Sequence, residues 1–322
     1  MRTLRDILVE KAVNGAPIMD QLEKTSGIAM TAGIIPASNG VFHKWKLSGA
    51  LPSATIRLVG ASVTGSATNN TLGRQDLQEF TMFHPEDWKV VGELGGGKDQ
   101  SAADRYFKET YPQYLEGMLQ DISKQMIYGT NSTFGDVDGF NGFHDYARTN
   151  SKVTQLGGVT GSRTSIFVVR WNPKFCSVLL NPNVISNLAE IMTSTRPAFN
   201  PSTTSVTTGA KQPTWETWHT TDMGLMVAST VSVWAITQAD DSNPPTSAEM
   251  MAALRGVHSG RDLANTKIYC NERGRDMIFG LNDANLISTD STDSYDNRIM
   301  TFNGVEIVVD ENISDVETTV LD

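Results

Sequence analysis

The residues whose types and spacing come nearest to catalytic chemistry lie in Gly92–Asp99, GELGGGKD, which fits the G-x-x-x-x-G-K pattern of a phosphate-binding loop. A strand-like WKVV precedes this segment and a helical pattern follows it, as such a loop requires. The hydrophobic run VEIVVD, Val305–Asp310, ends in an acid that resembles the magnesium-binding acid of nucleotide hydrolases. The two segments make nucleotide binding a hypothesis.

The residue after the lysine argues against this hypothesis. The Ser or Thr that would bind magnesium is replaced by Asp99, whose carboxylate would repel a phosphate and is better suited to cap the following helix. We therefore interpret the glycines as a flexible hinge, and a degenerate nucleotide-binding protein stays as an alternative. The hinge residues are Gly95, Gly96 and Gly97.

Other residues capable of chemistry are scattered. Asp136 and Asp138 hint at calcium, but Ala147 stands where the closing Glu of a calcium loop is required. The five histidines have no second histidine or cysteine three or four residues away, and HExxH, CxxC and GxSxG are absent from the sequence. Cys176 and Cys270 each lie in an apolar run, which indicates buried free thiols. We predict no catalytic, cofactor-binding or metal-binding residues, and a protein that is not an enzyme.

The composition excludes some partners. The chain has 322 residues and a net charge of −10, so it is a poor non-specific binder of nucleic acid. No apolar run approaches the roughly 20 residues that a membrane helix needs. The N-terminus lacks the apolar core of a secretory signal. We therefore expect a protein made in the cytoplasm, with no membrane partner.

One long amphipathic helix, Ser101–Tyr128, organises the chain. Asp99 or Ser101 is expected to cap its start and Gly129 to end it. Pro112 favours a kink or a restart of the helix. An apolar stripe at helical spacing predicts its core face, formed by Tyr111, Leu115, Met118, Leu119, Ile122 and Met126.

A hairpin pattern, Phe42–Phe83, precedes the helix. Its strands VFHKWKLSG, ATIRLVG and QEFTMF alternate in polarity, and the polar stretch GASVTGSATNNTLGR between them predicts an exposed tip. Strands that are polar on both faces are marginal alone and need another surface to lie on.

The remaining segments are shorter. We expect short helices in residues 1–40, and then β-rich structure in residues 151–238 with a long polar connection, PAFNPSTTSVTTGAKQPTW. The last third of the chain predicts a helix at Glu249–Val257, a strand KIYCN, a helix ERGRDMIFGL, a polar loop DANLISTDSTDSYDN and a hairpin turning at Asn303-Gly304.

The order of these blocks resembles the major capsid proteins of tailed phages, which have the HK97-like fold, and in particular the gp7-like major head protein family. The resemblance runs along most of the chain. It is carried by LPSATIRLVG, YLEGMLQDISKQMIYGTNSTFGDVDGFNGF, TSIFVVRWNPKFCSVLLNP, WETWHTTDMGLMVASTVSVWAI, KIYCNERGRDMIFGL and FNGVEIVVDENI.

The resemblance implies an α+β fold with an N-terminal arm, an extended E-loop hairpin, a spine helix, a peripheral (P) domain and an axial (A) domain. The blocks stand in a different order from the HK97 prototype, which implies a rearranged (permuted) topology. The position of the HK97 prototype's G-x-P-V-V block reads Gly304-Val-Glu-Ile-Val here, without the proline. The implied divisions are 1–40 for the arm, 41–90 for the hairpin, 91–150 for hinge and spine helix, 151–205 for A-domain strands, 206–260 for P-domain return strands and helix, and 261–322 for the second A-domain segment.

The function implied is that of a virion shell subunit. Copies are expected to assemble as hexamers and pentamers into an icosahedral shell, which encloses double-stranded DNA without sequence-specific binding. Scaffolding, portal and decoration or cement proteins are the expected partners. A non-shell virion protein, such as a cement or tail subunit, is a further alternative. The hairpin residues expected to contact a neighbouring subunit are Phe42, Lys44, Lys46, Arg57 and Arg74.

Overall fold

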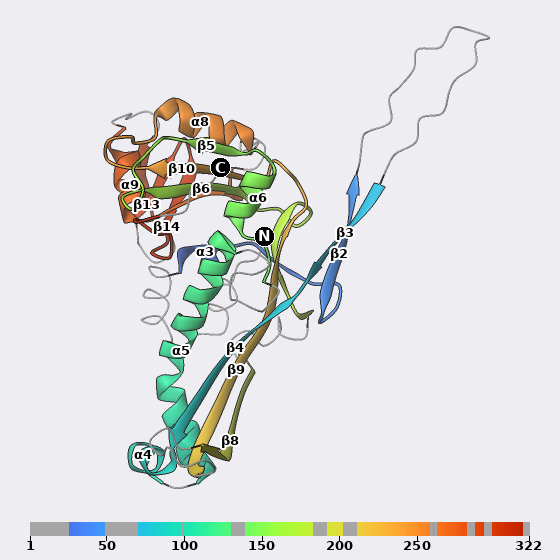
Figure 1. Ribbon diagram of the computed structural model, residues 1–322, viewed down its shortest axis with the longest axis vertical. Coiled ribbons are helices and arrows are strands. Elements are labelled where there is room, and N and C mark those ends of the chain that lie inside the picture. Colours follow the sequence, from blue (N-terminus) through green and yellow to red (C-terminus); the bar gives the residue numbers. More distant parts are fainter. Residues whose placement is uncertain are drawn as a thin grey trace, which may run out of the picture.

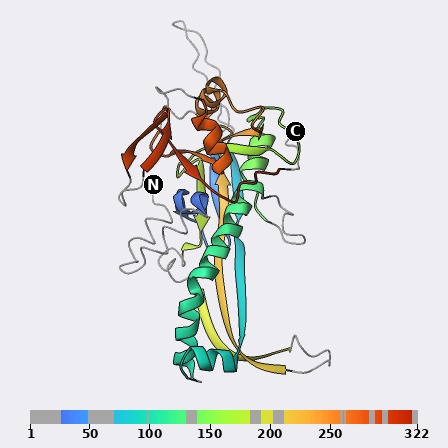
Figure 2. The same ribbon diagram turned by 90° about the vertical axis from the view of Figure 1, so that its left-hand side faces the viewer.

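The computed structural model describes residues 26–48, 70–97, 99–129, 139–182, 192–201, 211–257, 260, 263–281, 287–292 and 298–317. Within these residues the strands form a seven-stranded, a five-stranded and a two-stranded sheet. The seven-stranded sheet and its helices make a broad head (Figure 1). A long helix and long strands run down from the head to a narrow tip (Figures 1 and 2). The two-stranded sheet stands beside the head and points obliquely upward, away from the body (Figure 1).

The long helix is α5, Gln100–Tyr128, whose 29 residues span about 43 Å at 1.5 Å per residue. The Asp99 carboxylate accepts a hydrogen bond from the Ala102 amide at 3.1 Å, and Gly129 is the C-cap, as predicted. The helix runs through Pro112 without interruption, so the expected restart is wrong. Proline removes one backbone donor, and the turns on either side keep theirs.

The lower half of the molecule is a helix packed on a sheet. The sheet order is β1 (Ile34–Pro36), β7 (Cys176–Leu180), β9 (Lys211–Val227) and β4 (Gln78–Asp87), with β8 (Met192–Pro201) also paired to β9. Phe80 and Met82 of β4 pack against the same core as α5. The expected polar connection, residues 197–215, is partly wrong, because its first five residues belong to β8 and its last five to β9, and the two strands pair with each other. Residues 202–210 lie outside the described residues.

The strand-like interpretation of WKVV is also wrong, because these residues begin a helix, α4 (Trp88–Leu94). The Asp87 side chain caps this helix by accepting the Lys89 amide at 2.7 Å. Val91 is fully buried in a cluster with Phe107 and Trp215. Capping and this burial favour a helix over an edge strand.

The head is built on the seven-stranded sheet, and its interior strand β6 (Thr164–Arg170) is buried at all seven positions. Phe167 and Val169 face the core shared with α5 and with α6 (Phe143–Thr149), and Ile166 and Val168 face the opposite side. The second side is covered by α8 (Ser247–Gly256) and α9 (Glu272–Phe279). The strand order is β12 (Ile287–Thr292), β13 (Arg298–Phe302), β14 (Val305–Val309), β11 (Thr266–Cys270), β6, β10 (Val233–Ala239) and β5 (Val153–Gln155).

Most predicted elements of the head are present. The strands β6 and β11, the helices α8 and α9 and the turn at Asn303-Gly304 lie where the sequence indicates, and both turn residues have positive φ. Residues 287–292 form β12, so the expected polar loop there is partly wrong. The implied ranges 151–205 and 206–260 each contribute strands to both large sheets, because the chain leaves the head after β6 and returns to it with β10.

The projecting sheet is a ladder of β2 (Phe42–Ser48) and β3 (Asn70–Asp76), which we call the arm. Asn70–Arg74 is a strand, although its composition indicates a loop. QEFTMF, expected in the hairpin, belongs to β4 and pairs with β9 over its whole length. Leu77 separates β3 from β4, so one extended chain pairs first with β2 and then with β9.

At the described start of the chain, a single helical turn, α3 (Gly27–Thr31), packs between α5 and the head, and β1 then joins β7 in parallel. The expected helices before Ser26 lie outside the described residues.

Candidate functional site

The glycine-rich segment does not have the geometry of a phosphate-binding loop. Gly92 lies inside α4, and Gly95 ends that helix with its amide donating to the Val91 carbonyl at 2.8 Å. Gly96 has φ of 74°, in the left-handed region that favours glycine. The segment therefore joins two helices, whereas a phosphate-binding loop follows a strand. Lys98 lies outside the described residues.

Asp310, the acid at the end of the nucleotide-like segment Val305–Asp310, accepts hydrogen bonds from neighbouring amides. It follows β14 and is fully buried. Its carboxylate accepts the Ile28 amide at 2.8 Å and both the backbone amide and the side-chain amide of Asn312, at 2.9 and 2.8 Å. Burial raises the pKa of Asp310, and these hydrogen bonds oppose that shift. The carboxylate thus ties α3 to the head.

The two halves of the nucleotide-like pattern are also far apart. Asp310 binds α3 beside the C-terminal half of α5, whereas Gly95–Gly97 lies at the N-terminal end of α5, at the tip of the molecule (Figure 1). A helix of this length separates its ends by about 43 Å. Asp310 therefore does not share a site with the glycine-rich segment.

The scattered histidines are packing residues where the structure describes their contacts. The His84 ring stacks on Tyr114 of α5 with centroids 4.4 Å apart, and Tyr114 stacks on His219 of β9 at 5.6 Å. Burial lowers the pKa of both histidines. The sequence holds no signal for this stack, because only the pairing of β4 with β9 brings His84 and His219 together.

Asp136 and Asp138 of the calcium hint lie outside the described residues. Among the residues that the structure describes, no three His, Cys, Asp or Glu side chains gather as a metal site would require.

The described end of the chain is clamped to α5 and β6. The Tyr128 hydroxyl donates to the Glu317 carboxylate at 2.7 Å and accepts the Ser314 amide at 2.9 Å. Ser165 donates to the other Glu317 oxygen at 2.7 Å. Burial raises the pKa of Glu317. No sequence pattern indicates this clamp, which joins residues almost 190 positions apart.

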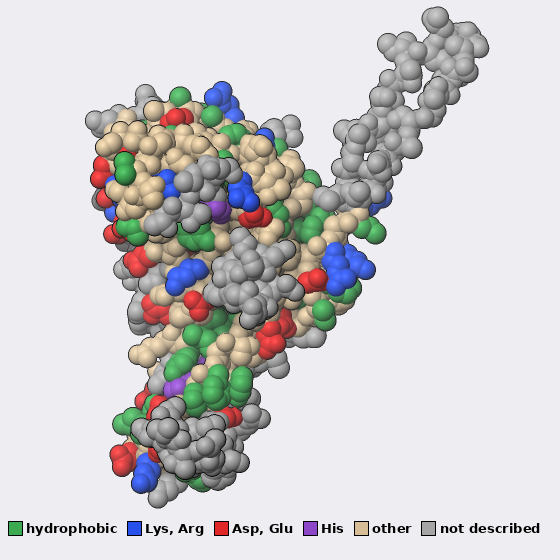
Figure 3. All heavy atoms as spheres, in the orientation of Figure 1, with side chains coloured by type: hydrophobic (Ala, Val, Ile, Leu, Met, Phe, Trp, Pro, Cys, Tyr) green, Lys and Arg blue, Asp and Glu red, His purple; other side chains and the backbone are tan. Residues whose placement is uncertain are grey.

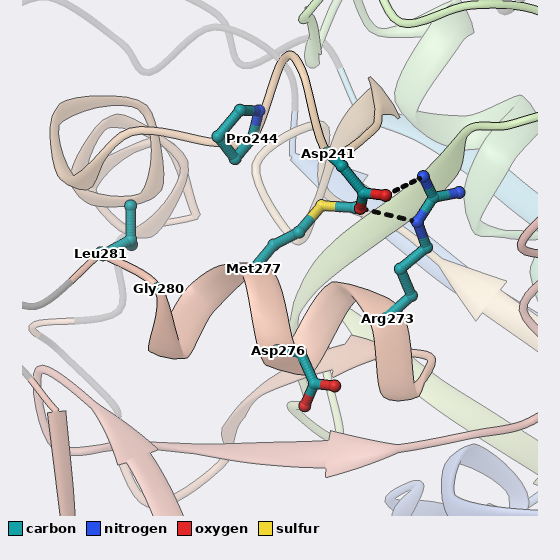
Figure 4. A pocket seen from close by; sticks show the side chains of 7 residues that line it. All are labelled: Asp241, Pro244, Arg273, Asp276, Met277, Gly280 and Leu281. Carbon is teal, nitrogen blue, oxygen red and sulfur yellow. Dashed lines mark hydrogen bonds and ion pairs between the residues drawn. The ribbon is translucent and has the colours of Figure 1, made fainter.

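A pocket of about 430 Å³ lies between α9 and the turn at residues 240–244 (Figure 4). Arg273 and Asp241 form an ion pair at 3.0 Å on its wall, and Arg273 also donates to the Ser162 carbonyl at 2.8 Å. Met277, Pro244 and Leu281 supply apolar lining. The guanidinium is thus occupied in joining loops of the head.

The arm carries the most distinctive surface. Phe42, Lys44 and Lys46 share one face of β2, and the residues opposite them on β3 are Asp76, Arg74 and Leu72. The Lys44 ammonium lies 4.8 Å and the Arg74 guanidinium 4.6 Å from the centre of the Phe42 ring. Lys44, Lys46 and Arg74 are exposed, and Leu72 is 80% exposed.

This cationic face stands out where the arm leaves the body (Figure 3). Arg74 makes an ion pair with Asp76 at 2.7 Å, on the same face. Arg57 lies outside the described residues. The arm therefore presents positive charge and exposed apolar surface together, on a chain whose net charge is −10.

The predicted spine-helix residues lie at the core. Leu115, Met118, Leu119, Ile122 and Met126 are all buried between α5, the five-stranded sheet and the head. The side chain of Tyr111 is outside the described part. None of the described helices is long and apolar enough to cross a membrane.

Two solved phage structures share this arrangement. A protein of bacteriophage epsilon15 aligns with 90% of this chain and 88% of its own length, with a TM-score of 0.59 and 17% identity. The capsid of bacteriophage JBD30 aligns with 95% of this chain and 98% of its own, with a TM-score of 0.50 and 9% identity. The class is therefore the α+β, HK97-like fold of tailed-phage capsid subunits, as predicted.

The sequence identifies the family. The profile of major capsid protein GP7 matches residues 10–321, so the chain belongs to the GP7 major capsid protein family. It is a shell-forming major capsid protein of the phage virion. No protein with a curated description matches the chain.

Proposed function

We propose that copies of this protein associate as hexamers and pentamers and close into an icosahedral shell around double-stranded DNA. The observation that carries this proposal is the arm, a two-stranded ladder that projects from the body with an exposed cationic face. A two-stranded ladder is marginally stable alone, and it gains stability by lying on another surface.

The arm's partner in this proposal is a neighbouring copy. Lys44, Lys46 and Arg74 offer positive charge, and a body with excess acids offers the complement. Phe42 and Leu72 add apolar area at the same face, and Arg57 is proposed to extend the contact. Unpaired strand edges of the arm can also pair with a second chain.

The acidic chain suits a wall that encloses DNA without binding it in a sequence-specific way. Scaffolding, portal and decoration or cement proteins are the further partners proposed. We propose a structural role without catalysis or a cofactor.

The hinge at Gly95, Gly96 and Gly97 and the permuted topology are further parts of the proposal. The glycines join α4 to α5 at the tip, where bending would change the angle between the helix and the strands. The chain enters the head at β5 and β6, leaves it for β7, β8 and β9, and returns at β10, which supports an A domain made of two separate segments.

Electron microscopy of the purified protein tests assembly. We expect rings, capsomers or closed icosahedral particles in negative stain. A stable monomer under all conditions contradicts the proposal, and tubes or sheets without icosahedral closure favour a tail or cement subunit.

Charge reversal tests the arm. Changing Lys44, Lys46 and Arg74 together to Glu is expected to abolish particles while leaving the thermal unfolding of the subunit unchanged, because these side chains are exposed. A matched control changes Lys89, Lys124 and Lys174 to Glu, which adds the same charge on the body. Equal assembly of both variants refutes a role for the cationic face.

A further inference from the structure

At the root of the arm, one aromatic ring occupies the space that a side chain would need on the facing strand. Trp45 of β2 lies directly opposite Gly73 of β3. A Cβ atom added to Gly73 would overlap the indole ring of Trp45. Gly73 is therefore required here by close approach of the ring, because its φ is not in the left-handed region.

The other side of Trp45 packs on the body. Its ring joins an apolar cluster with Ala37, Leu179 of β7 and Met226 of β9, and Leu77 lies in the same cluster. The indole is thus a wedge between the arm and the five-stranded sheet. On the opposite face of the arm, Lys44, Lys46 and Arg74 are exposed to solvent.

The polar end of this ring is not used. The Trp45 indole N–H is buried and has no hydrogen-bond partner among the residues that the structure describes. A buried unpaired donor costs free energy. The position thus favours the size and shape of the indole over its capacity to hydrogen-bond.

The Trp45 ring packs next to the junction between the arm and the five-stranded sheet. Leu77 is the single residue between β3 and β4, and its amide donates to the Val41 carbonyl at 2.8 Å. On one side of Leu77 the chain pairs with β2, and on the other side it pairs with β9. The ladder has no core of its own, so packing at this root sets its angle to the body.

We propose that the contact between Trp45 and Gly73 positions the arm, and so decides which surface of a neighbouring copy the arm reaches. The part concerning the neighbour rests on the proposed function of the arm. The part concerning direction belongs to the single subunit and can be measured without assembly.

A distance between spin labels measures the direction. Leu72 on the arm and Leu263 on the head are 80% and 44% exposed, so Leu72→Cys with Leu263→Cys gives two accessible thiols. The native thiols, Cys176 and Cys270, are fully buried, and burial raises the pKa of both, so they resist labelling. Pulsed electron resonance on the unassembled subunit then reports the distance distribution between arm and head.

Gly73→Ala is the main perturbation. We expect the distribution to shift or broaden, because the methyl group displaces the Trp45 ring, while circular dichroism and thermal unfolding of the body stay unchanged. Gly260→Ala is the matched control, since an added Cβ there meets no described atom within 4 Å and its φ is outside the left-handed region. An unchanged distribution in Gly73→Ala overturns the proposal.

Two further variants separate positioning from folding. Trp45→Ala leaves Gly73 intact and removes the wedge, so the distribution should broaden even if Gly73→Ala is poorly folded. Adding Trp45→Phe to Gly73→Ala provides a smaller ring that leaves room for the methyl group, and should restore the wild-type distance. If Trp45→Ala does not broaden the distance distribution and the Trp45→Phe, Gly73→Ala variant does not restore it, the contact between Trp45 and Gly73 does not set the direction of the arm.

Assembly reactions then test the consequence. If Gly73→Ala moves the arm, we expect loss of closed particles or particles of altered diameter, with recovery in the Trp45→Phe, Gly73→Ala variant. Normal particles from a subunit with a displaced arm overturn the link to assembly. Failure of the wild-type protein to assemble contradicts the proposed function instead, and leaves the distance result standing.

Discussion

Replacement of Asp310 by Ala distinguishes a structural carboxylate from a magnesium ligand. The change leaves the Ile28 amide buried without its acceptor, which costs about 1–3 kcal/mol. The two donors of Asn312 lie nearer the surface, and each loses about 0.5–1.5 kcal/mol. Removing a buried carboxylate whose pKa is raised by burial recovers part of this loss. We expect a net destabilisation of about 3 kcal/mol.

Urea unfolding of the unassembled subunit measures this loss. Asp310→Asn retains one carbonyl oxygen as an acceptor and should lose less stability than Asp310→Ala. Hydrogen exchange adds a local reading, because the Ile28 amide should lose its protection in Asp310→Ala. As a control, Asp121→Ala removes an exposed carboxylate whose ion pair with Lys124 spans 3.9 Å, and should change the free energy of unfolding by less than about 0.5 kcal/mol.

Two results would refute the reasoning. The first is a loss of less than about 1 kcal/mol for Asp310→Ala, which would mean that water replaces the carboxylate at little cost. The second is a thermal stabilisation of the wild-type protein by Mg-ATP that disappears in Asp310→Ala. That result would restore the nucleotide-binding alternative.

Three other changes probe the head and its helices. The pKa of His144 is lowered by burial, and by Arg148, to about 4, so its stabilisation is complete above its ordinary pKa of 6.5 and is lost as the pH falls toward 4. In urea unfolding, the wild-type protein should lose about 2 kcal/mol more than His144→Gln between about pH 7.5 and about pH 5. Tyr128→Phe removes the hydrogen bond to Glu317 and should cost about 1–3 kcal/mol, read by the same assay, with earlier proteolysis of the chain end. Gly256→Ala pushes a methyl group into the Trp234 ring and should cost about 1–3 kcal/mol in thermal unfolding.

The elements that could be predicted from the sequence are those with a strong local pattern. In α5, apolar residues recur at helical spacing between a capping Asp99 and a terminating Gly129, so existence and ends follow from local physics. In β6 a continuous apolar run predicts a strand buried on both faces, and both faces are covered.

The strands that escaped prediction are polar. Asn70–Asp76, Met192–Pro201 and Ile287–Thr292 are rich in Ser, Thr, Asn and Asp, which favour turns when considered alone. Each becomes a strand because a partner strand supplies its backbone hydrogen bonds. Pairing across many residues is a tertiary effect, and local composition does not encode it.

In helix α4, tertiary contacts also override local composition, but here a strand-like segment becomes a helix. WKVV has the composition of a strand, yet Asp87 caps it and Val91 inserts beside Phe107 of α5. The local preference is weak, and burial against a helix that begins nine residues later decides the outcome.

Among the candidate sites too, features that follow from a local sequence pattern could be predicted, and features that depend on strand pairing could not. A projecting arm could be predicted, because strands with two polar faces cannot build a core and must lie on another surface. That Lys44 and Lys46 share one face of a strand could also be predicted, because they alternate with Trp45. Arg74 joins that face only through the pairing of β2 with β3. The contact between Trp45 and Gly73 at the root of the arm could not be predicted from the sequence. It depends on the register in which β2 pairs with β3.

Asp310 shows why a motif needs its surroundings before it acquires a meaning. A buried strand that ends in an acid is the local pattern of a magnesium site and equally of a carboxylate that caps a neighbouring segment. The two cases differ only in what approaches the carboxylate. Here the donor is the Ile28 amide, 282 residues earlier in the chain. Since a carboxylate that already accepts three N–H groups has few lone pairs left for a metal, the contacts of Asp310 favour the structural role.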